Sequence, residues 1–254
     1  MDLNIIADYH THTNIAKGHI PLLRDLVKTH AKGSLKENAS AAISRGLKEI
    51  AITDHGYRHI MYGMIINQYQ EVRREIDEIN KEYKNKNYDF RLLLGAECNI
   101  ININGDIDID NEVIKYLDII CAGFHRGALH NLNVKNNYTE AAVNAIEKNK
   151  ITILNHPVDH VNPDIIEIGK AAVRRNTALE INRSHKNISI DDIKKLKQMG
   201  VKFSLGSDSH ISSTIGTFGE AYKIALEAGL TNDDIVNADG EAHKNMNKTI
   251  IVSK

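Results

Sequence analysis

Along this chain, short apolar runs rich in β-branched residues alternate with longer stretches in which apolar residues recur every three or four positions. The short runs are typical of strands buried on both faces, and the longer stretches are typical of amphipathic helices. Repeated strand–helix units predict an α/β fold with a parallel sheet. The seven candidate strands are Asn4–Tyr9, Glu49–Thr53, Arg91–Glu97, Leu117–Ala122, Ile151–Asn155, Thr177–Asn182 and Val201–Gly206.

The segments between the candidate strands have helical periodicity, and the first of them follows Ser34, a good N-cap residue. The predicted helices are Leu35–Arg45, Gln68–Tyr83, Thr139–Lys148, Pro163–Arg174, Ser189–Met199 and Gly219–Ala228, with a further helix start at Thr231. Lys84–Asp89 is a candidate loop, and Ile100–Asp110 is predicted to form a hairpin or an extended excursion. No Pro-, Gly- or Ser-rich linker divides the sequence, so we predict one domain over residues 1–254.

Composition narrows the class of protein. The 254 residues are 42% hydrophobic, enough for a sizeable core, and the formal charge of −1 gives no net attraction to nucleic acid or anionic membrane. No apolar run approaches the roughly 20 residues that span a bilayer, and the first residues do not form a signal peptide, so we expect a soluble, cytoplasmic protein. Cys98 and Cys121 are too few for a disulfide framework and are predicted to be reduced core residues.

Histidine is the unusual residue, with 13 in the chain. Six of the seven candidate strands end in, or run directly into, a side chain that can bind metal. In a barrel of parallel strands, the loops that follow the strands converge on one face, so we expect these side chains to share one pocket. The candidates at strand ends are His10, His12, Asp54, His55, Glu97, His125, His156, Asp208 and His210.

The spacing and the donor types indicate which ions such a pocket would hold. Strand alternation places His10 and His12 on the same side, and Asp208 and His210 repeat this spacing. Imidazole nitrogens with a few carboxylates suit zinc, manganese or iron, whereas calcium prefers oxygen. Glu97 is suited to bridge two ions, because a carboxylate offers two oxygens.

Each of these features taken alone also fits a structural role. A lone His-x-His, a Thr-Asp-His or a His-Pro turn is more often structural, and His125 also fits a core histidine satisfied by its neighbours. Their recurrence at corresponding strand ends favours a metal cluster. Glu180 and Asn182 are expected to support ligands rather than to act as ligands. We interpret the remaining histidines as structural or surface residues, with His59 and Tyr57 as candidates for the pocket mouth: His59, His130, His160, His185 and His243.

The ordered motifs resemble those of the polymerase and histidinol phosphatase (PHP) family, and the resemblance runs from Asp8 to His210. The motifs are Ala7-Asp8-Tyr9-His10-Thr11-His12-Thr13, Ile52-Thr53-Asp54-His55-Gly56, Gly95-Ala96-Glu97-Cys98-Asn99-Ile100, Ala122-Gly123-Phe124-His125, Asn155-His156-Pro157, Leu179-Glu180-Ile181-Asn182 and Leu205-Gly206-Ser207-Asp208-Ser209-His210. The resemblance implies a distorted (β/α)7 barrel with two or three divalent ions, Zn, Mn or Fe, at the C-terminal ends of the strands.

The resemblance also implies a ligand set. One ion would be held by His10, His12, Glu97 and Asp208; a second by Glu97, His125 and His156; and a third by His55, His210 and one further histidine. The family commonly places that histidine shortly after the first motif, which His19 nearly satisfies. We favour His30, because it leads into the helix from Leu35 and lies at the family's distance before His55. Residues 14–28 would then be an insertion.

The reaction predicted for such a cluster is hydrolysis of a phosphate ester by metal-activated hydroxide. Asp208 could orient or deprotonate the nucleophile, and His210 or His55 could assist the leaving group. Arg126 and Arg183 are candidate phosphate anchors, because guanidinium binds phosphate bidentately, although exposed arginines are usually only solvated.

The leading hypothesis is therefore a stand-alone phosphatase for a small phosphomonoester, with L-histidinol phosphate as the family's namesake substrate. A nuclease or nucleotide phosphodiesterase is the second hypothesis, which the neutral charge and the 5% aromatic content do not favour. A metal-stabilised binding domain without catalysis is the third, and the intact ligand motifs argue against it. We expect no membrane partner and make no prediction of the oligomeric state.

Overall fold

The computed structural model describes residues 2–16, 30–59, 62–125 and 137–247. Seven strands form one sheet in which sequence neighbours are paired in parallel. The prediction of an α/β fold with a (β/α)7 barrel is confirmed by this arrangement. The strands are β1 (Ala7–Thr11), β2 (Glu49–Ile52), β3 (Arg91–Asn99), β4 (Ile119–Gly123), β5 (Ile153–Leu154), β6 (Ala178–Asn182) and β7 (Phe203–Gly206).

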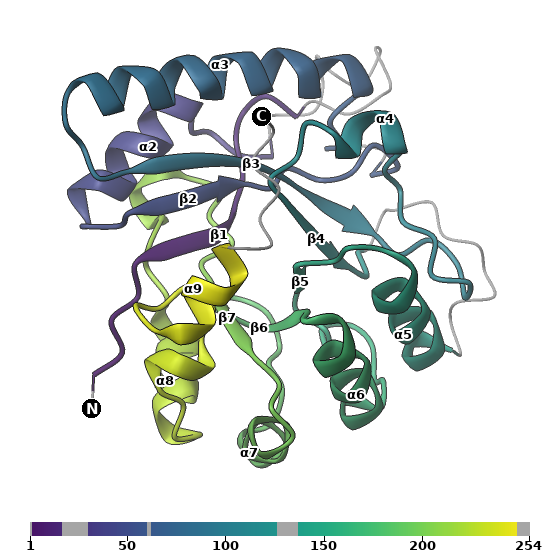
Figure 1. Ribbon diagram of the computed structural model, residues 1–254. Coiled ribbons are helices and arrows are strands. Elements are labelled where there is room, and N and C mark those ends of the chain that lie inside the picture. The colour runs from purple at the N-terminus through teal and green to yellow at the C-terminus, as the bar shows by residue number, and fades with distance from the viewer. Residues whose placement is uncertain (1, 17–29, 60–61, 126–136, 248–254) are drawn as a thin grey trace.

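Helices alternate with the strands and lie around the outside of the sheet (Figure 1). None of the described helices combines the length and apolar character that crossing a membrane requires. The helices are α2 (Leu35–Ser44), α3 (Ile66–Asn85), α4 (Asn111–Ile114), α5 (Tyr138–Lys148), α6 (Ile165–Arg175), α7 (Ile190–Gln198), α8 (Gly219–Glu227) and α9 (Glu241–Asn247), with short 3-10 turns at η2 (Ser212–Thr214) and η3 (Asn232–Asp234).

Both faces of the sheet are buried, which explains why the strands read as continuous apolar runs. Along β2, Ile50 and Ile52 belong to the outer core between sheet and helices, whereas Ala51 belongs to the inner core of the barrel. Ala242 and Met246 of α9 also belong to the inner core, so this helix covers the N-terminal end of the barrel. The alternation of small and large residues thus separates two apolar layers.

The barrel is nearly closed by contacts between its first and last strands. At one end, Thr11 and Ser209 form a parallel bridge. At the other end, the side chain of Asn237 lies in the seam: its amide donates hydrogen bonds to the carbonyls of Ala7 (2.8 Å) and Leu205 (2.9 Å), and its oxygen accepts one from the Leu205 amide (2.9 Å). One side chain therefore replaces backbone pairing that the two strands do not make there.

The start of the first strand differs from the predicted one. The strand begins at Ala7 rather than at Asn4, because the preceding residues pair with the C-terminal segment instead: Ile5 forms an antiparallel bridge with Ala238. The register between β1 and β2 also shifts between Asp8 and Thr11. This shift lies where the strand changes from the inner-core residues Ala7 and Tyr9 to the polar residues near the C-terminal end of the barrel.

One helix prediction needs correction. The helix start at Thr231 leads only into the 3-10 turn η3, because Ile235 just after it forms a parallel bridge with Phe203. The last helix, α9, begins at Glu241. Within the predicted excursion, Ile100 and Ile107 form an antiparallel bridge, and the short helix α4 follows it.

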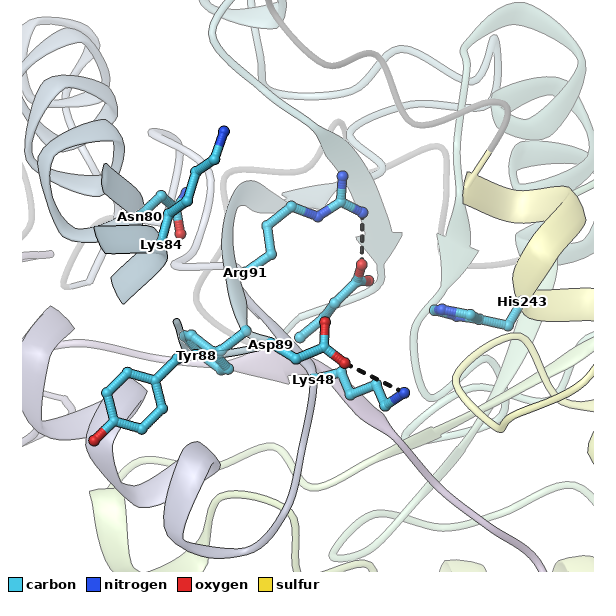
Figure 2. Close-up of a pocket in the computed structure, with 9 residues that line it drawn as sticks. Lys48, Asn80, Lys84, Tyr88, Asp89, Arg91 and His243 are labelled. Atoms are coloured by element: carbon cyan, nitrogen blue, oxygen red, sulfur yellow. Dashed lines mark hydrogen bonds and ion pairs between the residues drawn. The ribbon is translucent and has the colours of Figure 1, made fainter. Parts of the chain in front are cut away.

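The N-terminal end of the barrel carries a cavity of about 470 Å³ with a paired polar network beside it (Figure 2). The hydroxyl of Tyr9 donates to Oε2 of Glu49 (2.8 Å) and lies 3.2 Å from Nδ1 of His243. Arg91 donates to the other oxygen of Glu49 (2.6 Å). Because these partners satisfy the buried carboxylate, we assign this network a structural role.

Replacing Tyr9 by Phe removes the hydroxyl that donates a hydrogen bond to Oε2 of Glu49. This buried carboxylate oxygen then lacks that donor. We expect the free energy of unfolding to fall by about 1–3 kcal/mol, measured by urea denaturation. The matched control is Tyr88→Phe, because Tyr88 lines the same cavity but is 48% exposed, and its loss of a hydroxyl should cost less than about 0.5 kcal/mol. Equal stabilities of the two variants would contradict the structural role.

Candidate metal centre

The histidines and carboxylates predicted from the strand ends lie together at the C-terminal end of the barrel. They come from different parts of the chain, because each follows or ends a strand, apart from His30, which precedes α2. Most are almost fully buried, as shown by exposures of 1% for Glu97 and 2% for His10. The side chains that meet here are His10, His12, His30, His55, Glu97, His125, His156, Asp208 and His210.

Glu97 lies at the centre of this group, on β3. Its Oε1 is 3.0 Å from His10 Nε2, 2.9 Å from His125 Nε2 and 3.0 Å from His156 Nε2, and its Oε2 is 2.9 Å from His55 Nδ1 and 3.6 Å from His12 Nε2. The amide of Asn155 donates a further hydrogen bond to Oε1 (3.0 Å). A carboxylate offers about four lone-pair sites, so hydrogen bonds alone do not account for this crowding.

Asp208, just beyond β7, forms a second point of contact. Its Oδ1 lies 3.2 Å from Nε2 of His12 and 3.4 Å from Nε2 of His10. Its Oδ2 lies 2.9 Å from Nε2 of His185. Asp208 therefore joins the two histidines of the first strand to a residue that follows β6.

Surrounding oxygen atoms determine how three of the imidazoles are oriented. Each imidazole donates its Nδ1 proton to an acceptor: His10 to Glu180 Oε1 (2.6 Å), His125 to Asn99 Oδ1 (2.8 Å) and His210 to the Asp208 carbonyl (2.9 Å). In a neutral ring, the other nitrogen then carries a lone pair. Metal-binding histidines are typically held in this way by an outer hydrogen bond.

In His125 and His210 the remaining nitrogen faces another acceptor, Oε1 of Glu97 or Nε2 of His30, an arrangement that a cation would stabilise. Nδ1 of His55 is buried and makes no hydrogen bond, although Oε2 of Glu97 is only 2.9 Å away. Ligands of one ion with bonds of about 2.1 Å lie about 3.0–3.4 Å apart, close to the distances around Glu97. Within this cluster, three groups have ligand atoms within 4.8 Å of one another: His10, His12 and Asp208; His10, Glu97 and His156; and His12, His55 and Glu97.

His30 meets both of the histidines that the resemblance assigns to the same ion. Its Nε2 is 3.4 Å from Nε2 of His55 and 2.5 Å from Nε2 of His210. His19, the other candidate, lies outside the described residues, as do Arg126 and residues 17–28 of the predicted insertion.

Arg183 is described, and its side chain lies beside the start of α8. Its side chain runs past Gly219 at the start of α8, where a Cβ would come within 3.4 Å of the arginine Cγ. Within the described part of the chain, the Arg183 side chain makes no hydrogen bond or ion pair with the histidine and carboxylate group.

The charges of the cluster suit a cation-binding site. Burial raises the pKa of Glu97, but the charges of His10 and His125 lower it by more, so the carboxylate stays ionised. Burial lowers the pKa of His55 to about 4 and, with the charge of His210, that of His30 to about 2. Burial also lowers the pKa of His10, but Glu180 and Glu97 raise it well above the usual value, so without an ion this ring holds a proton. Binding an ion would release that proton.

Backbone strain concentrates at this end of the barrel. Among the described residues, five non-glycine residues have positive φ, and three of these belong to the loops around the cluster: His156 (27°), His160 (58°) and Asp208 (51°). Such conformations are costly for residues with a Cβ and are maintained only when the surrounding contacts enforce them.

Sequence reasoning missed His185, which contacts Asp208 and whose Nδ1 lies 2.8 Å from Oδ2 of Asp159. A signal was present, because His185 comes three residues after the end of β6, the one strand to which no ligand had been assigned. His59 was expected at the pocket mouth, and its ring stacks on that of His55 with centroids 4.5 Å apart.

Comparisons with known proteins agree with this geometry. No model of a known protein family matches the chain. A probable phosphatase of Thermoanaerobacter sp. (strain X514) is 31% identical over 251 residues, covering 93% of this chain and 92% of that protein. A probable phosphatase of Clostridium acetobutylicum is 32% identical with the same coverage, and one of Shewanella piezotolerans is 30% identical over 94% of this chain and 92% of its own length.

Among solved structures, the chain is similar in fold to a histidinol phosphate phosphatase from Lactococcus lactis, determined with zinc, L-histidinol and phosphate. The TM-score is 0.60 with 20% sequence identity, and the match covers 88% of this chain and 94% of the other. This likeness supports the barrel fold.

Proposed function

Because the chain belongs to the family of the bacterial probable phosphatases described above, we propose that this phosphoric ester hydrolase is a metal-dependent phosphatase of the PHP kind, acting on a small phosphomonoester. The observation that carries the proposal is the ring of five imidazole nitrogens around the buried carboxylate of Glu97. A phosphatase needs concentrated positive charge to bind a phosphate dianion, and this donor set is suited to hold it.

The proposed ligand sets share Glu97. His10, His12, Glu97 and Asp208 would hold one ion; Glu97, His125 and His156 a second; and His30, His55 and His210 a third. The short distances within each set support this assignment, and so do the outer hydrogen bonds from Glu180, Asn99 and the Asp208 carbonyl.

The chemistry divides between the ions and the chain. When bound, divalent ions supply a water of lowered pKa and neutralise the phosphoryl oxygens. Asp208 orients the attacking water or takes its proton, and His55 or His210 assists the leaving oxygen. Glu180 holds the ring of His10 in place, and burial of the cluster keeps bulk water from the ligands. Arg126 and Arg183 are proposed as phosphate anchors.

Replacing Glu97 by Gln removes the charge that the ligand sets share. We expect fewer ions per chain by elemental analysis. We also expect kcat/KM to fall by more than the roughly 10–100-fold that is typical when a residue that only hydrogen-bonds to a metal ligand is replaced. The control is Glu78→Gln, an exposed glutamate on α3, which should keep both its ions and its activity. Unchanged metal content in Glu97→Gln would rule out its bridging role.

The assignment of the ninth ligand is tested by replacing each candidate histidine. His30→Ala should lower metal content and activity, because its Nε2 faces both His55 and His210. His19→Ala should leave both unchanged. Metal content is measured by elemental analysis and activity by turnover of p-nitrophenyl phosphate. Loss of metal and activity in His19→Ala but not in His30→Ala would assign the ninth ligand to His19.

The substrate class is tested by turnover of the metal-loaded protein. The panel is p-nitrophenyl phosphate, L-histidinol phosphate, nucleotides and single-stranded oligonucleotides, and L-histidinol phosphate is included because the Lactococcus structure holds L-histidinol and phosphate. We expect the small phosphomonoesters to be hydrolysed, and a chelator to abolish turnover until divalent metal is restored. Preferred cleavage of oligonucleotides would favour a nuclease, and no turnover of any compound would refute the phosphatase proposal.

A further inference from the structure

A second group of histidines and a carboxylate lies beside the main cluster. Asp159 and His160 belong to the loop after β5, and His185 belongs to the loop after β6. Nδ1 of His185 and Nε2 of His160 each lie 2.8 Å from the same oxygen of Asp159, and the ligand atoms of the three residues are all within 4.8 Å of one another. The ligand sets proposed above use none of these residues.

We propose that Asp159, His160 and His185 form a separate, exchangeable site for one zinc ion, or for a similar transition-metal cation. Two imidazole nitrogens and one carboxylate oxygen form the donor set of open zinc sites, in which water completes the coordination. Magnesium and calcium prefer oxygen donors and would bind here poorly. The three donors converge on one point from two neighbouring loops.

The orientation of His185 suits a metal ligand. Its Nε2 lies 2.9 Å from Oδ2 of Asp208, so that carboxylate can accept the Nε2 proton. Its Nδ1 lies 2.8 Å from Oδ2 of Asp159, so the nitrogen that would bind the ion already faces the carboxylate ligand. The hydrogen bonds and charges of Asp208 and Asp159 raise the pKa of His185 to about 9, so a metal ion would bind with release of the Nδ1 proton. A carboxylate that fixes the other ring nitrogen is the usual support for a metal-binding histidine.

Exposure increases across the group, which gives an ion a path from solvent. The side chains of Asp159, His185 and His160 are 9%, 33% and 41% exposed, respectively. The nearly buried carboxylate of Asp159 therefore lies at the bottom of the site, and His160 lies at its solvent-exposed edge. Three protein ligands, two of them partly exposed, predict weaker and faster-exchanging binding than in the main cluster.

The loop conformation also favours a ligand role for His160. Its φ of 58° lies in the left-handed region, which histidine adopts at some cost. The same loop carries His156, whose carbonyl accepts a hydrogen bond from the amide of Asp159 (2.9 Å). Bonds of about 2.0–2.1 Å place zinc ligands about 3.3 Å apart, so each nitrogen needs to move away from the Asp159 oxygen by roughly half an ångström, which exposed side chains allow.

The test is a zinc titration of protein whose main cluster already holds its metal ions. Zinc binding is measured by calorimetry and by equilibrium dialysis with elemental analysis. The variants are His160→Asn and Asp159→Asn; asparagine is chosen at position 160 because it tolerates the left-handed conformation. The control is Asn162→Ala, an exposed residue of the same loop. We expect one additional zinc per chain in the wild type and the control, and none, or binding at least 10-fold weaker, in the two variants.

Three results would overturn the inference. These are no additional zinc in the wild type, the same additional zinc with unchanged affinity in both variants, and loss of the main-cluster ions in His160→Asn, since the site would then not be separate. The readout is independent of phosphatase activity. If the wild type binds the additional zinc but hydrolyses no phosphate ester, the proposed function is refuted and the proposed zinc site is not.

Discussion

The structure depends on how one buried carboxylate is compensated. Glu97 is 1% exposed, and an isolated charge at such a depth would be strongly destabilising. Its compensation comes from histidines carried by loops and strands far apart in the sequence, and only a barrel of parallel strands brings these segments to one point. The fold and the chemistry are therefore two consequences of the same arrangement, because the site exists only when all the strands are in register.

The two ends of the barrel meet different physical demands. At the C-terminal end, buried nitrogens such as Nδ1 of His55 lack a hydrogen bond, and residues such as Asp208 have a strained backbone conformation. Both features cost stability, which indicates that this end serves a function. At the N-terminal end, Asn237 closes the seam and Tyr9 and Arg91 satisfy Glu49. Residues 9 and 10 are adjacent on one strand, yet one belongs to the stabilising end and the other to the cluster. The register of β1 against β2 shifts in this same segment, between Asp8 and Thr11.

Local patterns predicted most of the fold. Strands buried on both faces read as apolar runs, and ligands placed directly after such runs could be expected to share one face. The details that depend on long-range contacts could not be predicted. Nothing in the local sequence indicates that the side chain of Asn237 closes the seam between the first and last strands, and the pairing of Ile5 with Ala238 spans almost the whole chain. His185 was missed for a different reason, because a histidine three residues beyond a strand has no distinctive spacing of its own.

Whether divalent ions share the carboxylate of Glu97 can be seen by anomalous diffraction from crystals of the metal-loaded protein, with data collected above and below the absorption edge of the metal. We expect at least two anomalous peaks within coordination distance of the Glu97 oxygens, one beside His10 and His12 and one beside His125 and His156. Crystals that contain the metal but show no anomalous peak at Glu97 would contradict it.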